Sequence, residues 1–169
     1  MKRLHLALAW TLLWLGGPFL HAEPPQVEAL SGKAIRVIDG DTLELLVQRQ
    51  PVRVRLNHID APEQGQPFGD QARRQLAGLC AGVFATVSTQ GQDRYGRTIG
   101  EVNCAGRHAN EYMVAQGWAW VYRHYAPANS PLLGLEMVAR ELRLGLWSDP
   151  QPPVPPWDWR RQQRNAVNR

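Results

Sequence analysis

Four acidic residues lie close to two expected turns, where their oxygens could hold a metal ion. Asp39 and Asp41 are separated by one glycine, and Asp60 and Glu63 follow segment 52–56, in which apolar and polar residues alternate. Carboxylates that face one another repel unless a cation lies between them. Ligands that are all oxygens favour a hard cation, calcium or magnesium, over zinc. Asp and Gly are also ordinary turn residues, so a simple turn stays open as the alternative.

Two arginines flank these acids at positions that suit phosphate chemistry. Arg55 lies five residues before Asp60, and Arg97 ends the turn-forming segment 93–97. A cation and two guanidinium groups can neutralise the charge that builds up on a phosphodiester under attack. A free carboxylate beside the metal can orient or deprotonate the attacking water. The spacing alone fits equally well with structural ion pairs between these arginines and the acids.

The pattern around these residues predicts short strands with helices between and after them. Strands are expected over 34–37, 43–47, 52–56, 83–88 and 98–102. Helices are expected over 72–80, 110–116 and from Ser130 to near Gly145. This order predicts an α+β chain built on a five-stranded OB-fold barrel capped by three α-helices. The chain has 169 residues, which leaves room for one such domain, assigned to residues 33–148.

The first 22 residues have the pattern of a secretory signal peptide. A basic start is followed by an apolar run over 4–15, then Gly-Gly-Pro and a small residue, Ala22, at the expected cut. The run is short for a membrane span, so an uncleaved anchor is the less favoured alternative. We therefore expect an exported protein, periplasmic or extracellular, with no membrane contact after cleavage. Residues 23–32 are expected to be a loosely structured lead-in.

The positive charge of the chain is concentrated at its two ends. The whole sequence has a net charge of +4, from 19 basic and 15 acidic residues. Two basic residues lie in 1–22, and 157–169 has four arginines and one aspartate, so residues 23–156 carry 13 − 14 = −1. Residues 149–169 are rich in proline and arginine and are expected to form an extended tail. Affinity for phosphate must then come from a few placed arginines and a bound cation.

Two cysteines, Cys80 and Cys104, are expected to form a disulfide. In an oxidising compartment an even number of cysteines favours pairing. The bridge would close a loop of about 24 residues, worth roughly 3 kcal/mol in the loop-entropy model. Two buried free thiols are the alternative.

Three motifs, in order, strongly resemble the thermonuclease family, the staphylococcal-nuclease-like domains. They are Val-Ile-Asp-Gly-Asp-Thr at 37–42, Arg-Val-Arg-Leu-Asn-His-Ile-Asp-Ala-Pro-Glu at 53–63 and Asp-Arg-Tyr-Gly-Arg at 93–97. Residues 110–119, 136–140 and 145–147 match later parts of the family pattern. The resemblance runs from Lys33 to Trp147 and implies the same barrel with three helices.

The resemblance also implies a calcium site. Asp41 and Asp60 would bind one Ca²⁺ ion through their side chains, and Ala61 would bind it through its backbone carbonyl. Mg²⁺ or Mn²⁺ would be possible substitutes. Asp39 would support the turn that holds the metal. A threonine is usual in the family where this chain has Ala61, and a backbone ligand survives that change.

By the same resemblance, the chain would hydrolyse DNA and RNA with little sequence preference. Glu63 would act as the general base or position the water, while Arg55 and Arg97 would hold the phosphate and stabilise the transition state. Further substrate contacts are expected at Arg94, Tyr95, Tyr122, Arg123 and Tyr125. The alternative is a module of the same fold that binds nucleic acid without cutting it. The residues expected to bind the metal, act as base and hold the phosphate are all present, which argues for catalysis: Asp41, Asp60, Glu63, Arg55 and Arg97. A monomer is expected.

Overall fold

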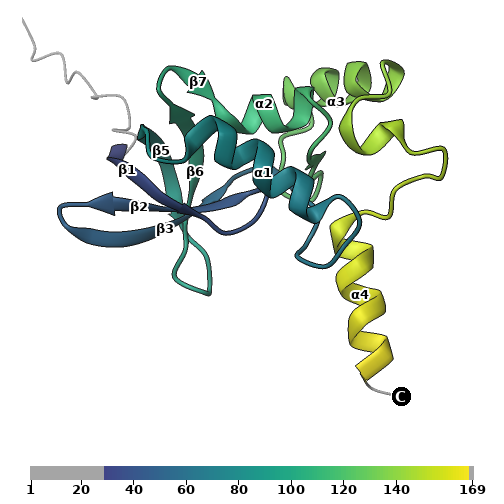
Figure 1. Cartoon of the computed structure of the whole chain (residues 1–169), viewed down its shortest axis with the longest axis horizontal. Coiled ribbons are helices and arrows are strands. Elements are labelled where there is room, and N and C mark those ends of the chain that lie inside the picture. Colours follow the sequence, from purple (N-terminus) through teal and green to yellow (C-terminus); the bar gives the residue numbers. More distant parts are fainter. Residues whose placement is uncertain (1–28, 168–169) are drawn as a thin grey trace, which may run out of the picture.

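The computed structural model describes residues 29–167, and its centre is a closed barrel (Figure 1). The barrel strands are β1 (Ala29–Val37), β2 (Thr42–Val47), β3 (Gln50–Leu56), β5 (Phe84–Gln92) and β6 (Thr98–Cys104). Neighbouring strands run antiparallel in the order β3-β2-β1-β5-β6. Strands β3 and β6 then pair in parallel, which closes the sheet. The predicted five-stranded barrel is confirmed.

Alternating apolar residues on the strands build the inside of the barrel. In the β2–β3 hairpin, Leu43 lies opposite Val54 and Leu45 lies opposite Val52. Leu43, Leu45 and Val54 are fully buried. Because successive side chains on a strand point to opposite faces, this period-2 pattern fixes which face is inside. The core therefore forms where the sequence pattern places it.

Two short pairings add to this framework, and one of them holds an acidic residue. Strand β7 (Arg107–His108) pairs with β6, and β4 (Ile59–Asp60) pairs with β8 (Trp120–Val121) in a separate two-stranded sheet. In that small sheet Asp60 lies opposite Trp120. Backbone pairing therefore holds Asp60 in place.

The three predicted helices are present. They are α1 (Gly69–Cys80), α2 (Ala109–Ala115) and α3 (Leu132–Glu141), and α3 packs on α2 beside the barrel. Helix α3 ends earlier than expected, because Arg143 adopts a left-handed backbone conformation with φ 53° that a helix cannot contain. The chain continues as a short 3₁₀ helix, η1 (Gly145–Ser148).

A fourth helix, α4 (Pro156–Val167), replaces the extended tail that the sequence predicts. Proline is favourable in the first turn of a helix, and no Gly or Pro follows Pro156 within α4. Asp158 in the first turn also pairs with Arg161 at 2.9 Å. Figure 1 shows α4 projecting from the rest of the molecule, with its N-terminal end nearest to it. The prediction of three helices was therefore one helix short.

The N-terminal part of the barrel also begins earlier than expected. Strand β1 starts at Ala29 and pairs with β5 from Ala29 opposite Ser88 onwards, so residues 29–32 belong to the barrel. The predicted signal peptide, residues 1–22, lies outside the described residues and stays a prediction. Between residues 29 and 167, no helix has the length and apolar character needed to cross a membrane.

The disulfide expected from the sequence is present. Cys80, the last residue of α1, is bonded to Cys104, the last residue of β6, with a Cα–Cα distance of 5.2 Å. Both residues are fully buried. The bond therefore ties the first helix to the barrel.

Replacing both cysteines by alanine is expected to lower the free energy of unfolding by about 3 kcal/mol, because the unfolded chain regains the entropy of a loop with a sequence separation of 24. Urea denaturation of the variant and of the oxidised wild type measures the difference. Wild-type protein that has been reduced should show the same loss. A free-thiol titration of denatured, unreduced protein should find no thiol, and an unchanged unfolding free energy would contradict the prediction.

Candidate active site

A cleft of about 880 Å³ lies where the β1–β2 turn, the loop after β3 and the β5–β6 turn meet. Its lining includes ten of the residues singled out in the sequence: Asp39, Asp41, Arg55, Ala61, Glu63, Arg94, Tyr95, Arg97, Tyr122 and Tyr125. Asp60 lies directly behind this lining and is bonded to Arg55. Segments far apart in the chain thus meet at one opening.

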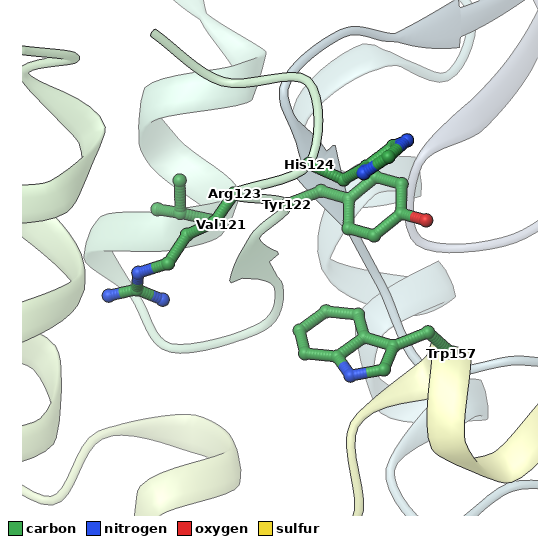
Figure 2. Close-up of a pocket in the computed structure, with 5 residues that line it drawn as sticks. All are labelled: Val121, Tyr122, Arg123, His124 and Trp157. Atoms are coloured by element: carbon green, nitrogen blue, oxygen red, sulfur yellow. The ribbon is translucent and has the colours of Figure 1, made fainter. Parts of the chain in front are cut away.

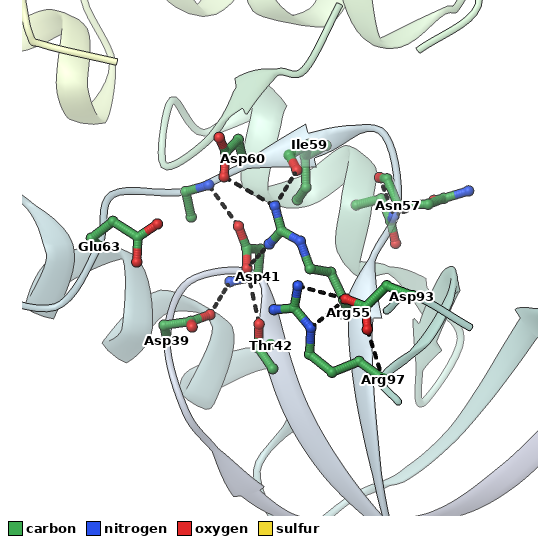
Figure 3. Close-up of polar contacts among 12 residues, drawn as sticks. Asp39, Asp41, Thr42, Arg55, Asn57, Ile59, Asp60, Glu63, Asp93 and Arg97 are labelled. Atoms are coloured by element: carbon green, nitrogen blue, oxygen red, sulfur yellow. Dashed lines mark hydrogen bonds and ion pairs between the residues drawn. The ribbon is translucent and has the colours of Figure 1, made fainter. Parts of the chain in front are cut away.

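Arg55 bridges the two buried aspartates at the base of the cleft (Figure 3). Its Nη1 contacts Asp41 Oδ1, and its Nη2 lies 3.0 Å from Asp60 Oδ1. The backbone N–H of Ala61 donates to Asp41 Oδ2 at 2.8 Å, and the N–H of Asp41 donates to Asp39 Oδ1 at 3.0 Å. These bonds fix the β1–β2 turn against the loop that follows β3.

The clustering of these acids shifts their proton affinities. Burial and the charge of Asp41 raise the pKa of Asp39 to about 7. Burial also acts to raise the pKa of Asp41, but the Arg55 guanidinium outweighs it and the pKa is lowered. For Asp60, burial raises the pKa in spite of its hydrogen bonds with arginine. Crowded carboxylates of this kind are stabilised in their charged form by a cation.

The available donors fit a hard cation. Asp41 and Asp60 offer carboxylate oxygens, and Ala61, whose N–H is bonded to Asp41, follows Asp60 directly. Calcium accepts carboxylate, backbone carbonyl and water oxygens together. Across residues 29–167, no three His, Cys, Asp or Glu side chains are grouped so that they could hold a metal. A cation here would therefore take several of its ligands from water.

The β5–β6 turn presents Arg97 on the other side of the cleft. Asp93 Oδ1 accepts hydrogen bonds from the backbone N–H groups of Tyr95 and Arg97, at 2.9 and 3.0 Å. Its Oδ2 accepts one from Arg97 Nε at 2.7 Å. Gly96 supplies the positive φ of 76° that the turn needs. Asp93 thus holds both the turn and the guanidinium.

Glu63 lies on the loop between β4 and α1, and its side chain is 37% exposed. Its N–H donates to Gln66 Oε1 at 3.0 Å, and its carbonyl accepts from the Gln66 N–H at 3.0 Å. The amide of Gln66 also donates to the carbonyl of Val154 at 2.7 Å. The backbone of Glu63 is therefore fixed by Gln66, which the motifs did not single out.

Comparison with known proteins identifies the family. The family described as "Staphylococcal nuclease homologue" matches residues 53–149. A protein named "Micrococcal nuclease" from Shigella flexneri is 45% identical over 147 residues, which cover 81% of this chain and 84% of that protein. This chain belongs to the staphylococcal nuclease family.

Two further relatives agree with this assignment. An "Uncharacterized endonuclease" from Escherichia coli is 42% identical over 86% of this chain and 94% of its own. "Protein ParB" from Escherichia coli is 48% identical over 85% of this chain and 86% of its own. Membership in the staphylococcal nuclease family confirms the resemblance and supports a nuclease, whose substrate is nucleic acid. The family match contains Arg55, Asp60, Glu63 and Arg97 but ends before α4.

Aromatic side chains line the side of the cleft next to α4. Tyr122 stacks on Trp157 with ring centres 5.5 Å apart, and it meets Tyr125 edge-on at 5.2 Å. Across the cleft, the guanidinium of Arg94 lies over the Tyr95 ring at 4.9 Å. Tyr122, Tyr125, Arg94 and Tyr95 are thus at the cleft, as the sequence predicts for substrate contacts.

Arg123 is the one predicted substrate residue that lies away from the cleft. Figure 2 shows its side chain extending away from Tyr122 and Trp157. Its Nη2 lies 2.9 Å from Oε2 of Glu136, a carboxylate on α3 that is almost fully buried. A buried carboxylate requires a cationic partner, which explains the position. Arg123 thus lies apart from the other predicted substrate residues, and its substrate role stays a prediction.

Arg160 on α4 is the residue that the sequence analysis missed. Its guanidinium contacts both Asp60 and Glu63. It belongs to no recognised motif, and the concentration of arginine in the tail was the only sign of it in the sequence.

Proposed function

We propose that this chain is an exported, calcium-dependent nuclease that hydrolyses phosphodiester bonds of DNA and RNA with little sequence preference. The observation that carries the proposal is the meeting of Asp41, Asp60, Arg55, Glu63 and Arg97 around one cleft. These groups come from three segments, and each has a use in phosphodiester hydrolysis.

Each residue would have a role that follows from its charge and its position in the cleft. Asp41, Asp60 and the carbonyl of Ala61 would hold the cation, which when bound polarises a phosphoryl oxygen and lowers the pKa of a bound water. Arg55 and Arg97 would donate charge-assisted hydrogen bonds to the oxygens on which charge accumulates.

Glu63 would take the proton of the attacking water. The water oxygen forms a bond to phosphorus as the bond from phosphorus to the 5′ oxygen breaks. The leaving 5′ oxygen takes a proton from a solvent water, so the products are a 3′-phosphate and a 5′-hydroxyl.

Export is supported by the disulfide. Structural disulfides persist in oxidising compartments and are rare in the cytosol. The bond between Cys80 and Cys104 is therefore consistent with a periplasmic or extracellular protein whose residues 1–22 are removed. We propose that the mature protein acts as a monomer, since one chain supplies every group named above.

Digestion of single-stranded DNA by purified protein spanning residues 23–169 tests this proposal. We expect degradation in calcium and none in excess chelator, because without the cation the aspartates repel the phosphodiester and nothing activates the water. Parallel digestions with magnesium or manganese in place of calcium define the metal preference. Equal degradation in chelator would contradict the metal requirement. Binding of the strand without cleavage in every metal would instead favour the non-catalytic binding module.

A further inference from the structure

The C-terminal strap, which we define as residues 154–167, packs against the cleft through its first two turns. Trp157 stacks on Tyr122 and meets Trp120 edge-on, with ring centres 6.4 Å apart. Pro156 is buried, and the carbonyl of Val154 accepts the hydrogen bond from Gln66. Residues 161–167 are exposed. The strap is thus attached through its first half and exposed along its second half.

Arg160 connects the strap to the acidic residues of the cleft. Its Nη2 lies 2.7 Å from Asp60 Oδ2, and its Nη1 lies 3.2 Å from Asp60 Oδ1. The same Nη1 lies 2.5 Å from Glu63 Oε1. Paired, bidentate contacts of this kind are the strongest that an arginine makes with a carboxylate. One guanidinium therefore links the proposed metal ligand to the proposed base.

A metal ion and Arg160 would compete for the same oxygens. Asp60 already receives Arg55 on Oδ1, and Arg160 engages both Oδ1 and Oδ2. A second positive charge a few ångströms from a divalent cation opposes its binding. Glu63 also cannot accept a proton from water through the oxygen that Arg160 occupies. Cation binding at Asp60 and proton transfer through Oε1 of Glu63 therefore both require Arg160 to move.

We propose that the strap is an autoinhibitory segment in which Arg160 acts as an internal counter-ion, holding Asp60, a proposed metal ligand, and Glu63, the proposed base, until calcium displaces it. The inference rests on the proposed function, because it concerns the same metal ligand and base. Release is feasible because the strap follows a proline-rich connection and residues 161–167 of α4 are exposed. In this state Arg160 offsets part of the negative charge of the two acids without a metal.

Calcium titration by isothermal calorimetry, without nucleic acid, tests the inference on protein spanning residues 23–169. Arg160→Gln is expected to bind calcium about tenfold more tightly than wild type, because a competing unit charge is removed from the site. Arg161→Gln is the matched control: it removes the same charge from the same helix, at a residue whose side chain is 67% exposed and pairs with Asp158. Its affinity should equal that of wild type.

A second variant separates displacement of the strap from a simple change in charge. Trp157→Ala keeps Arg160 but removes the stacking on Tyr122, so calcium should again bind more tightly than in wild type. In wild type, saturation with calcium should also increase hydrogen exchange of the α4 backbone amides. Equal or weaker calcium binding by Arg160→Gln, or unchanged hydrogen exchange in α4, would overturn the autoinhibitory role of the strap but not the proposed metal site. No calcium binding by any variant would overturn the proposed metal site as well.

Discussion

Replacing Glu63 by glutamine is expected to lower kcat by about 10²- to 10⁴-fold, the usual contribution of a positioned general base. The amide has the shape of the carboxylate but cannot accept the proton of the attacking water. Binding of the strand should change little, because the arginines and the cation provide it. Single-turnover digestion of single-stranded DNA at saturating calcium measures the effect on the chemical step.

The fold should survive this change. The loop at Glu63 is held by backbone hydrogen bonds with Gln66, and the half-exposed side chain supports no buried group. Glu101→Gln, an exposed carboxylate on β6 outside the cleft, is the matched control and should retain wild-type activity. Full activity of Glu63→Gln at an unchanged melting temperature would show that the base is another group.

Local patterns were enough to predict the barrel. The alternation of apolar and polar residues in segment 52–56 predicts both the strand and its buried face, because a shift of the strand register by one residue would expose Val54. The cysteine pair was predicted from compartment and count alone. The three helices were recognisable from spacing, although the end of α3 was not, because the left-handed conformation of Arg143 has no signal in its residue type.

Contacts between segments far apart in the chain could not be predicted from the sequence. Arg160 reaches Asp60 across 100 residues, and Gln66 reaches Val154 across 88. Neither contact follows from periodicity or from a motif, since each depends on where α4 docks. Arg123 illustrates the same point: counting along the family pattern predicted a substrate contact, but it could not predict the ion pair with buried Glu136 on α3.

The sequence left open whether Arg55 and Arg97 are structural ion pairs or bind phosphate. In the structure both are paired, Arg55 with two aspartates and Arg97 with Asp93. A guanidinium has five N–H donors, so an ion pair with a carboxylate need not engage all of them. Asp93 engages Nε and Nη2 of Arg97 and leaves the others available. An arginine held by a carboxylate is also better oriented towards a phosphate, so the two roles are compatible.

Replacing Arg97 by alanine is therefore expected to lower kcat by about 10²- to 10³-fold, as the loss of one charge-stabilising donor does in other enzymes. Arg97→Lys should recover only part of this, because an ammonium keeps the charge but lacks the two-pronged geometry. Steady-state kinetics on single-stranded DNA with calcium measures both variants. Arg107→Ala, an exposed arginine on β7 outside the cleft, is the control.

Arg97 tests the transition-state role more cleanly than Arg55. Removing Arg55 would leave the buried Asp41 and Asp60 without their shared partner, which destabilises the fold as well as the reaction. The pair of Arg97 with Asp93 lies at a partly exposed turn, where an ion pair contributes about 0–1 kcal/mol to stability. A loss of activity in Arg97→Ala at a nearly unchanged melting temperature therefore reports on phosphate chemistry. Wild-type kcat in that variant would remove Arg97 from the proposed mechanism and leave Arg55 as its single arginine.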